Sequence, residues 1–146
     1  MPTIEPRLGT WKLNVTKSKF SPVLLAFMKQ TPPKEETIVY RALGTDEFEM
    51  TVAGTQTDGK PIAGKTTAPR QGGLVKIQQG PFPEGTTIVT TRIDPNKSYV
   101  TVMLNGKQVL VGQNAVSKSG KQMTTTVKGA DPQGKPFEQV TVFDKQ

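Results

Sequence analysis

Short runs of β-branched and apolar residues, separated by turn-forming residues about every 8 to 12 positions, extend through the whole sequence. Thr and Val alone supply 34 of the 146 residues. Both favour extended backbone, because a branched Cβ packs well on a pleated surface. The pattern predicts an all-β protein and leaves little room for helices.

Alternation with a period of two predicts about ten strands. It is clearest where Phe48, Met50 and Val52 alternate with polar residues, which predicts that these three side chains face inward. In the last strand, Thr141 and Phe143 share one parity while Val140 and Val142 share the other, so its inward face stays open. The predicted strands are Leu8 to Val15, Glu36 to Leu43, Asp46 to Thr57, Pro61 to Ala68, Gly73 to Gln79, Thr86 to Ile93, Ser98 to Leu104, Gln108 to Val116, Gln122 to Lys128 and Phe137 to Phe143.

The predicted strands are joined by short turns. Asn105-Gly106 between two apolar runs is typical of a type I′ hairpin, because both residues tolerate a positive φ. Hairpin following hairpin indicates an antiparallel meander. At 146 residues the chain has the length of one domain. We therefore expect residues 1–146 to form a single domain, an antiparallel up-and-down β-barrel of about 8–10 strands.

Only one segment indicates a helix. Ser21 is a favourable N-cap, Pro22 suits the first helical position, and Leu24 and Phe27 recur at helical spacing before Thr31-Pro32-Pro33 ends the run. A helix this short is not stable alone. We expect it to follow the first strand and to pack its apolar face on the sheet.

Composition excludes several kinds of site. The chain has no Cys and no His, which excludes disulfides, thiol nucleophiles, Ser–His pairs and most zinc sites. The acidic residues lack metal-ligand spacing. We expect neither a metal nor a cofactor.

The net charge of +7 comes mainly from 15 Lys residues that are scattered singly. This distribution indicates a solvated surface rather than a nucleic-acid groove, which would need clustered basic and aromatic residues. The longest apolar run, Val23 to Met28, is too short to span a membrane. With no signal peptide as written, we expect a soluble cytoplasmic protein, or a periplasmic or secreted one if a leader was removed. The oligomeric state stays open.

Gly9-Thr10-Trp11-Lys12-Leu13, followed by Phe20 and the short helical segment, resembles the opening of the calycin superfamily. The intracellular fatty-acid-binding proteins look closest in these motifs, with the lipocalins next, and among lipocalins those of the bacterial lipocalin-like type. The resemblance implies a single lipocalin-like β-barrel domain over residues 1–146, with Trp11 in the first strand at its closed end. It also implies an internal site for a small molecule.

The chain departs from these families in three respects. Thr141 and Phe143 stand where fatty-acid-binding proteins carry the Arg-x-Tyr pair that grips a carboxylate, and the further arginine would fall near Gln113 or Asn114. No Arg follows Arg92 to cover Trp11 as in lipocalins. Only one helix is readable. Without a buried cation, an ionised head group inside the barrel would be costly, so a fatty acid held head-group-inward is not expected.

The candidate ligand-binding residues combine apolar wall positions with a few polar groups. They are Phe48, Met50, Val52, Val75, Ile77, Arg92, Tyr99, Met103, Thr141 and Phe143. Arg41, Arg92, Tyr40 and Tyr99 are the polar groups of most interest, although Arg92 and Tyr99 could instead pair across the Asp94-Pro95-Asn96 turn. Glu35, Glu36, Glu47 and Glu49 are expected to be solvated.

Three functions stay open. The preferred one is a carrier or sequestering protein for an apolar or amphipathic small molecule in the barrel cavity. The alternative is a cofactor-independent isomerase, lyase or cyclase that uses Arg41, Arg92 and Tyr99, a Lys, or a buried carboxylate. The third is an accessory module that binds a partner protein through an exposed strand edge or through the Leu24 and Phe27 surface.

Overall fold

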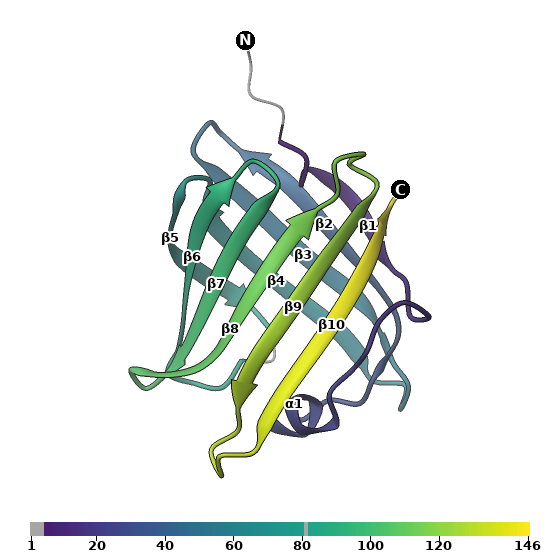
Figure 1. The fold of residues 1–146 in the computed structure, drawn as a ribbon, viewed down its shortest axis with the longest axis vertical. Coiled ribbons are helices and arrows are strands. Elements are labelled where there is room, and N and C mark those ends of the chain that lie inside the picture. The colour runs from purple at the N-terminus through teal and green to yellow at the C-terminus, as the bar shows by residue number, and fades with distance from the viewer. Residues whose placement is uncertain (1–4, 81) are drawn as a thin grey trace.

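A computed structural model of the chain describes residues 5–80 and 82–146, which form one closed antiparallel barrel with a short helix after the first strand (Figure 1). Its strand order is β1-β10-β9-β8-β7-β6-β5-β4-β3-β2. The elements are β1 (Gly9–Leu13), α1 (Pro22–Phe27), β2 (Pro33–Leu43), β3 (Glu47–Gln56), β4 (Pro61–Pro69), β5 (Gly72–Gln79), β6 (Thr86–Asp94), β7 (Lys97–Leu104), β8 (Lys107–Val116), β9 (Gln122–Ala130) and β10 (Pro136–Lys145). The predicted all-β up-and-down barrel is confirmed, and the described strands number ten.

The shortest strand closes the barrel. In β1, Trp11 stands opposite Ile38 of β2 on one side and opposite Lys145 of β10 on the other. Every described strand therefore has a hydrogen-bonded neighbour on both sides. Closure leaves no described strand as a free edge strand, which weakens the hypothesis of partner binding through a strand edge.

The first strand is shorter than the sequence pattern predicts. It ends at Leu13, and the chain then runs along β10, where the Asn14 amide donates to the Val142 carbonyl at 2.7 Å. Lys19 forms a bridge with Val140 farther along. Val15 is 45% exposed as a result, and the predicted extension of the first strand to Val15 is wrong.

The predicted helix start is confirmed. The Ser21 side chain accepts a hydrogen bond from the Leu24 amide at 3.2 Å, and Pro22 is the first helical residue. Leu24 and Leu25 are buried, so the apolar face of α1 packs inward. Figure 1 shows α1 at the lower end of the barrel, opposite the end where the C-terminus lies.

The hairpin predicted at Asn105-Gly106 is also confirmed. Asn105 has a φ of 51° and Gly106 a φ of 81°, which are the positive angles that a type I′ turn needs.

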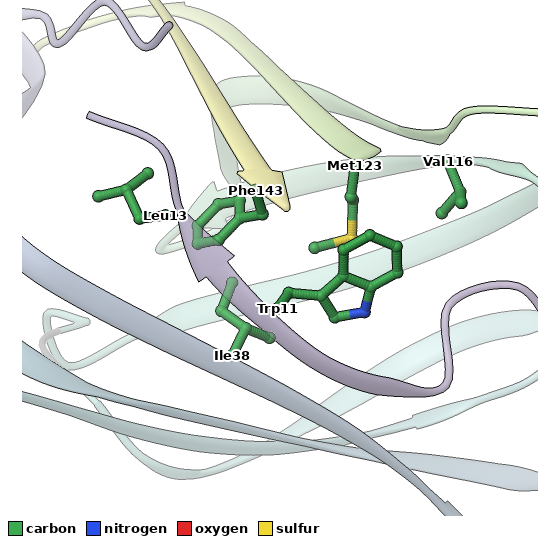
Figure 2. Close-up of a cluster of buried hydrophobic side chains, with 6 residues drawn as sticks. All are labelled: Trp11, Leu13, Ile38, Val116, Met123 and Phe143. Atoms are coloured by element: carbon green, nitrogen blue, oxygen red, sulfur yellow. The ribbon is translucent and has the colours of Figure 1, made fainter. Parts of the chain in front are cut away.

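A buried cluster surrounds Trp11 near the end of the barrel away from α1. It consists of Trp11, Leu13, Ile38, Val116, Met123 and Phe143. Trp11 and Met123 are fully buried, and Figure 2 shows Met123 beside the indole. The indole N–H donates to the Arg7 carbonyl at 2.8 Å, so its one polar group is satisfied. The predicted location of Trp11 in the first strand at a closed end agrees with this packing.

Lys145 covers Trp11 where no arginine was available. Its Nζ lies 4.7 Å from the centre of the Trp11 ring and also donates to the Leu8 carbonyl. Gly9 has a φ of +123°, and a Cβ added there would lie 2.7 Å from the Lys145 Nζ. The glycine of the Gly-x-Trp motif therefore makes room for the lysine.

We expect Met123→Ala to destabilise the fold by roughly 2–5 kcal/mol, because it removes a fully buried side chain from beside Trp11. Urea unfolding, monitored through the fluorescence of Trp11, measures this change in the free energy of unfolding. Met103→Ala is the matched control, since Met103 lies in β7 and is only partly buried. Its cost should stay below about 1.5 kcal/mol, and equal costs for the two variants would contradict the packing described.

Candidate ligand-binding cavity

The barrel encloses a cavity in two adjoining parts. The inner chamber, of about 390 Å³, extends from α1 to the end of the barrel beside Arg7, Arg70 and Arg92. The outer chamber, of about 320 Å³, lies against α1 and the loop between β5 and β6. Leu25, Glu36 and Phe82 line both chambers, so the two lie side by side.

Small inward-facing residues explain why the barrel is not filled by its own side chains. On β3 and β7 the even-numbered residues face inward and include the bulky Phe48 and Met50. The lining also includes the small residues Gly112 and Thr125, and Ala68 stands beside Phe48 on the neighbouring strand β4. A ten-stranded barrel is also wider than an eight-stranded one. The space that remains is lined mainly by apolar atoms.

The structure places most of the predicted ligand-binding residues in this lining. Phe48, Met50, Val75, Arg92, Thr141 and Phe143 line the inner chamber. Val52 lines the outer chamber, and Ile77 packs against the cluster formed by Val75, Ile88 and Val102. Because Thr141 and Phe143 line the chamber, the odd-numbered parity of β10 is the inward one. Contact of these residues with a ligand stays a prediction.

Tyr99 and Met103 line neither chamber. In β7 the inward residues are Ser98, Val100 and Val102, so the odd-numbered side chains belong to the outer face, and Tyr99 is 38% exposed. Sequence parity could not decide this strand, since both faces carry apolar residues. The prediction that Tyr99 and Met103 line the inside of the barrel is therefore wrong.

The three residues proposed for catalysis are not brought together. The Arg41 side chain is 64% exposed and its Nη2 contacts the Glu49 carboxylate at 2.7 Å. Lys65 lies 3.6 Å from the same carboxylate, which explains why Glu49 is buried rather than solvated as expected. With Arg41 and Tyr99 outside the lining, only Arg92 of the three reaches the inner chamber.

Arg92 pairs with Glu5 rather than with Tyr99. Its Nη1 and Nη2 lie 3.2 and 2.8 Å from the two Glu5 carboxylate oxygens, and its Nη1 also donates to the Arg70 carbonyl. The Arg70 Nη1 lies 3.8 Å from the same carboxylate. These side chains sit at the end of the barrel away from α1, because Arg70 directly follows β4 and Arg92 is near the end of β6.

Arg7 is a third arginine at this end of the chamber, and the sequence pattern did not reveal it. Its Nη2 donates to the Ser98 hydroxyl at 2.9 Å, and its guanidinium lies 5.7 Å from the centre of the Tyr40 ring. Burial raises the pKa of the Tyr40 phenol, although the charge of Arg7 opposes this change. Arg7 and Arg70 are isolated in the sequence, so only the fold brings them together. The prediction against an inward-facing carboxylate assumed that no buried cation is available to it, and that assumption is wrong.

Glu36 is the one carboxyl group among the described residues that lines both chambers. Burial is the main reason why its pKa is raised to about 7, and the negative charge of Glu35 adds to the increase. The expectation that Glu36 is solvated is wrong, because the even-numbered residues of β2 face inward together with Ile38 and Tyr40. A carboxyl group with a pKa near neutrality is able to give or take a proton inside the cavity.

The raised pKa of Glu36 predicts a pH dependence of stability. The folded chain keeps this proton up to about pH 7, whereas the unfolded chain loses it near pH 4.5. Folding is therefore favoured by Glu36 at low pH, and the free energy of unfolding should fall, by an amount on the order of 2 kcal/mol, as pH rises from about 4.5 to 7. Urea unfolding at several pH values measures this slope. Glu36→Gln should remove it and Glu138→Gln, at an exposed position, should not; an unchanged slope in Glu36→Gln would contradict the assignment.

Neither a metal centre nor a membrane-crossing helix is apparent in residues 5–80 and 82–146. No group of three or more His, Cys, Asp or Glu side chains in that part of the chain could hold a metal ion. No helix there is long and apolar enough to cross a membrane.

Comparison with known proteins gives matches among solved structures only. No protein-family model matches the chain, and no curated protein is significantly similar in sequence. The structure of a single-residue mutant of the fluorescent protein UnaG is similar over 99% of this chain and 99% of that chain, with 12% identity and a TM-score of 0.67. Wild-type UnaG gives 13% identity and a TM-score of 0.63 over 99% of this chain and 100% of that chain. A second single-residue mutant of UnaG gives the same identity of 13% and TM-score of 0.63 over 98% of both chains.

At this low identity the likeness is one of fold. Nearness to bacterial lipocalin-like proteins in particular is not supported by these matches and stays a prediction. The likeness nevertheless extends over nearly the whole chain, and so includes the meander, the Gly-x-Trp strand and the helix that follows it. The protein has a closed, ten-stranded antiparallel β-barrel fold, which is similar to that of UnaG.

Proposed function

We propose that this protein binds a small amphipathic molecule inside the barrel and acts as its carrier or sequestering protein. The observation that carries this proposal is the pair of adjoining chambers inside the barrel, whose walls are mainly apolar and whose polar groups gather at few places. Such a lining is typical of sites that hold a small molecule by burial and orient it by a few hydrogen bonds.

Burial supplies the main attraction in this proposal. Apolar surface removed from water contributes roughly 25 cal/mol per Å², and Val75, Ile88, Val100 and Val102 offer a broad apolar wall on one side of the inner chamber. Hydrogen bonds add orientation more than affinity, because the same groups bind water when the ligand is absent. Thr90, Ser98 and Thr125 supply hydroxyl groups for this purpose.

Filling the inner chamber should abolish binding. Gly112 lines the chamber, and a Cβ added there would meet its nearest neighbour, Val127, at an ordinary 3.5 Å. We expect Gly112→Phe to weaken binding of a hydrophobic fluorescent dye by at least about tenfold, because the ring occupies the ligand space. Fluorescence titration measures the dissociation constant, and thermal unfolding checks that the variant is folded.

Val111→Phe is the control for this substitution. Val111 is the neighbouring residue on the outer face of β8 and is 36% exposed. It should leave dye binding unchanged. If the unmodified protein neither binds the dye nor carries a co-purifying ligand, the proposed function is contradicted. If the two Phe variants bind the dye equally well, the site lies outside the barrel.

One observation favours a second candidate function, an isomerase, lyase or cyclase in the same cavity. Glu36 lines the cavity with a pKa of about 7, which suits a general acid or base at neutral pH. If this is its role, a molecule that co-purifies with the protein should be converted on incubation with fresh protein, and Glu36→Gln should bind it without converting it. Mass spectrometry of the molecule follows the conversion. An unchanged molecule with wild-type protein would leave the carrier function alone.

A further inference from the structure

Positive charge is in excess at the end of the inner chamber opposite α1. Arg7, Arg70 and Arg92 all line this end, which we call the arginine end. Glu5 is the carboxylate that pairs with it, and no other Asp or Glu in the described chain makes an ion pair with these arginines. The Arg92 and Arg70 side chains are only 13% and 19% exposed. Three largely enclosed guanidinium groups against one carboxylate leave a net attraction for anions inside the cavity.

Several polar atoms at the arginine end have no partner. The Nε atoms of Arg7 and Arg70 are buried without a hydrogen bond, and so is the Oδ1 of Asn114. Asn114 is 8% exposed and lines the inner chamber. Its Nδ2 donates a hydrogen bond to the Thr125 hydroxyl, and among the described residues this is the one hydrogen bond of its side chain. Buried polar groups are normally satisfied, because leaving one unpaired costs free energy. The polar groups at this end are therefore not fully satisfied by the chain itself.

Glu5 already shows how a carboxylate binds at this end. Its two oxygens accept from Nη1 and Nη2 of Arg92, which is the two-bonded geometry that guanidinium and carboxylate groups prefer. Its side chain is 5% exposed, so the pair is held away from solvent. Glu5 reaches this position from a segment outside the barrel strands. That segment, residues 5–8, is held through the Arg7 and Leu8 carbonyls, which accept from Trp11 and Lys145.

We propose that Arg70 and Arg92 form a binding site for the acidic end group of an amphipathic ligand, and that Glu5 occupies this site until the ligand displaces it. The inference rests on the proposed function and adds the chemical class of the ligand. The acidic group lies between Arg70 and Arg92, and the apolar part extends through the inner chamber toward α1. Exchange of one carboxylate for another keeps both arginines paired, so it avoids the large cost of an unpaired buried charge.

The exchange has a consequence for selectivity. A neutral amphiphile gains nothing at the arginine end, because Glu5 remains in place and no new ion pair forms. An acidic amphiphile gains the pair but must displace an intramolecular competitor, which lowers its apparent affinity. Removing the Glu5 charge should therefore strengthen binding of acids and leave neutral analogues nearly unaffected.

The experiment compares a dansyl-labelled undecanoic acid with its methyl ester, both titrated by fluorescence. In Glu5→Gln we expect the acid to bind about tenfold more tightly than in the unmodified chain, while the ester changes by less than about twofold. Adding Arg92→Gln to Glu5→Gln should remove the gain for the acid. Glu138→Gln, an exposed carboxylate in β10, is the control for net charge and should change neither dissociation constant.

The outcomes separate the two proposals. If neither probe binds to any variant, the proposed function fails. If both probes bind but Glu5→Gln changes acid and ester alike, the acidic-group site is overturned and the carrier function stands. If Glu5→Gln does not fold, Arg70→Gln decides, because it leaves the Arg92–Glu5 pair in place. It should reduce the preference for acid over ester, and an unchanged preference would overturn the site.

Discussion

The pairing of β1 with β10 is the constraint on which the rest of the structure depends. It turns a ten-stranded meander into a closed cylinder and so creates an interior surrounded by strands. β1 is the shortest strand, and its pairing is reinforced by Trp11, which is fully buried in the cluster at that end. The same indole binds the Arg7 carbonyl. Closure of the barrel and placement of the segment that carries Glu5 and Arg7 are therefore coupled.

The interior combines two environments that suit an amphipathic molecule. Apolar side chains from β3 to β8 line the middle of the cavity, while the arginine end lies opposite α1. Near α1 the cavity is lined by Leu24, Phe27 and Met28 together with the carboxyl group of Glu36. Phe27 and Leu24 thus form part of the cavity wall rather than an exposed surface for a partner protein. The arginine end and the carboxyl group of Glu36 are thus two separate polar regions that the proposed ligand would meet.

Local patterns predicted the elements well, and the site only in part. All ten strands, the helix start at Ser21 and the hairpin at Asn105-Gly106 follow from alternation, capping and turn chemistry, which act over a few residues. Inward residues were predicted correctly where one parity is polar, as in β3. In β7, where Tyr99 and Met103 alternate with Val100 and Val102, both faces are apolar and the prediction failed. The prediction that the first strand extends to Val15 was wrong, because β1 ends two residues earlier.

The sequence alone determined the strands, their antiparallel order and the absence of histidine and cysteine chemistry, because these properties depend on residue type and on neighbours in the chain. Only the tertiary structure decided the chemistry of the cavity. Glu5, Arg70 and Arg92 are far apart in sequence, and closure of the barrel brings them within contact distance. Burial then changes what each group does, as it does for Glu36, whose pKa rises to about 7. Desolvation and long-range ion pairing depend on where the chain folds, so no local pattern contains them.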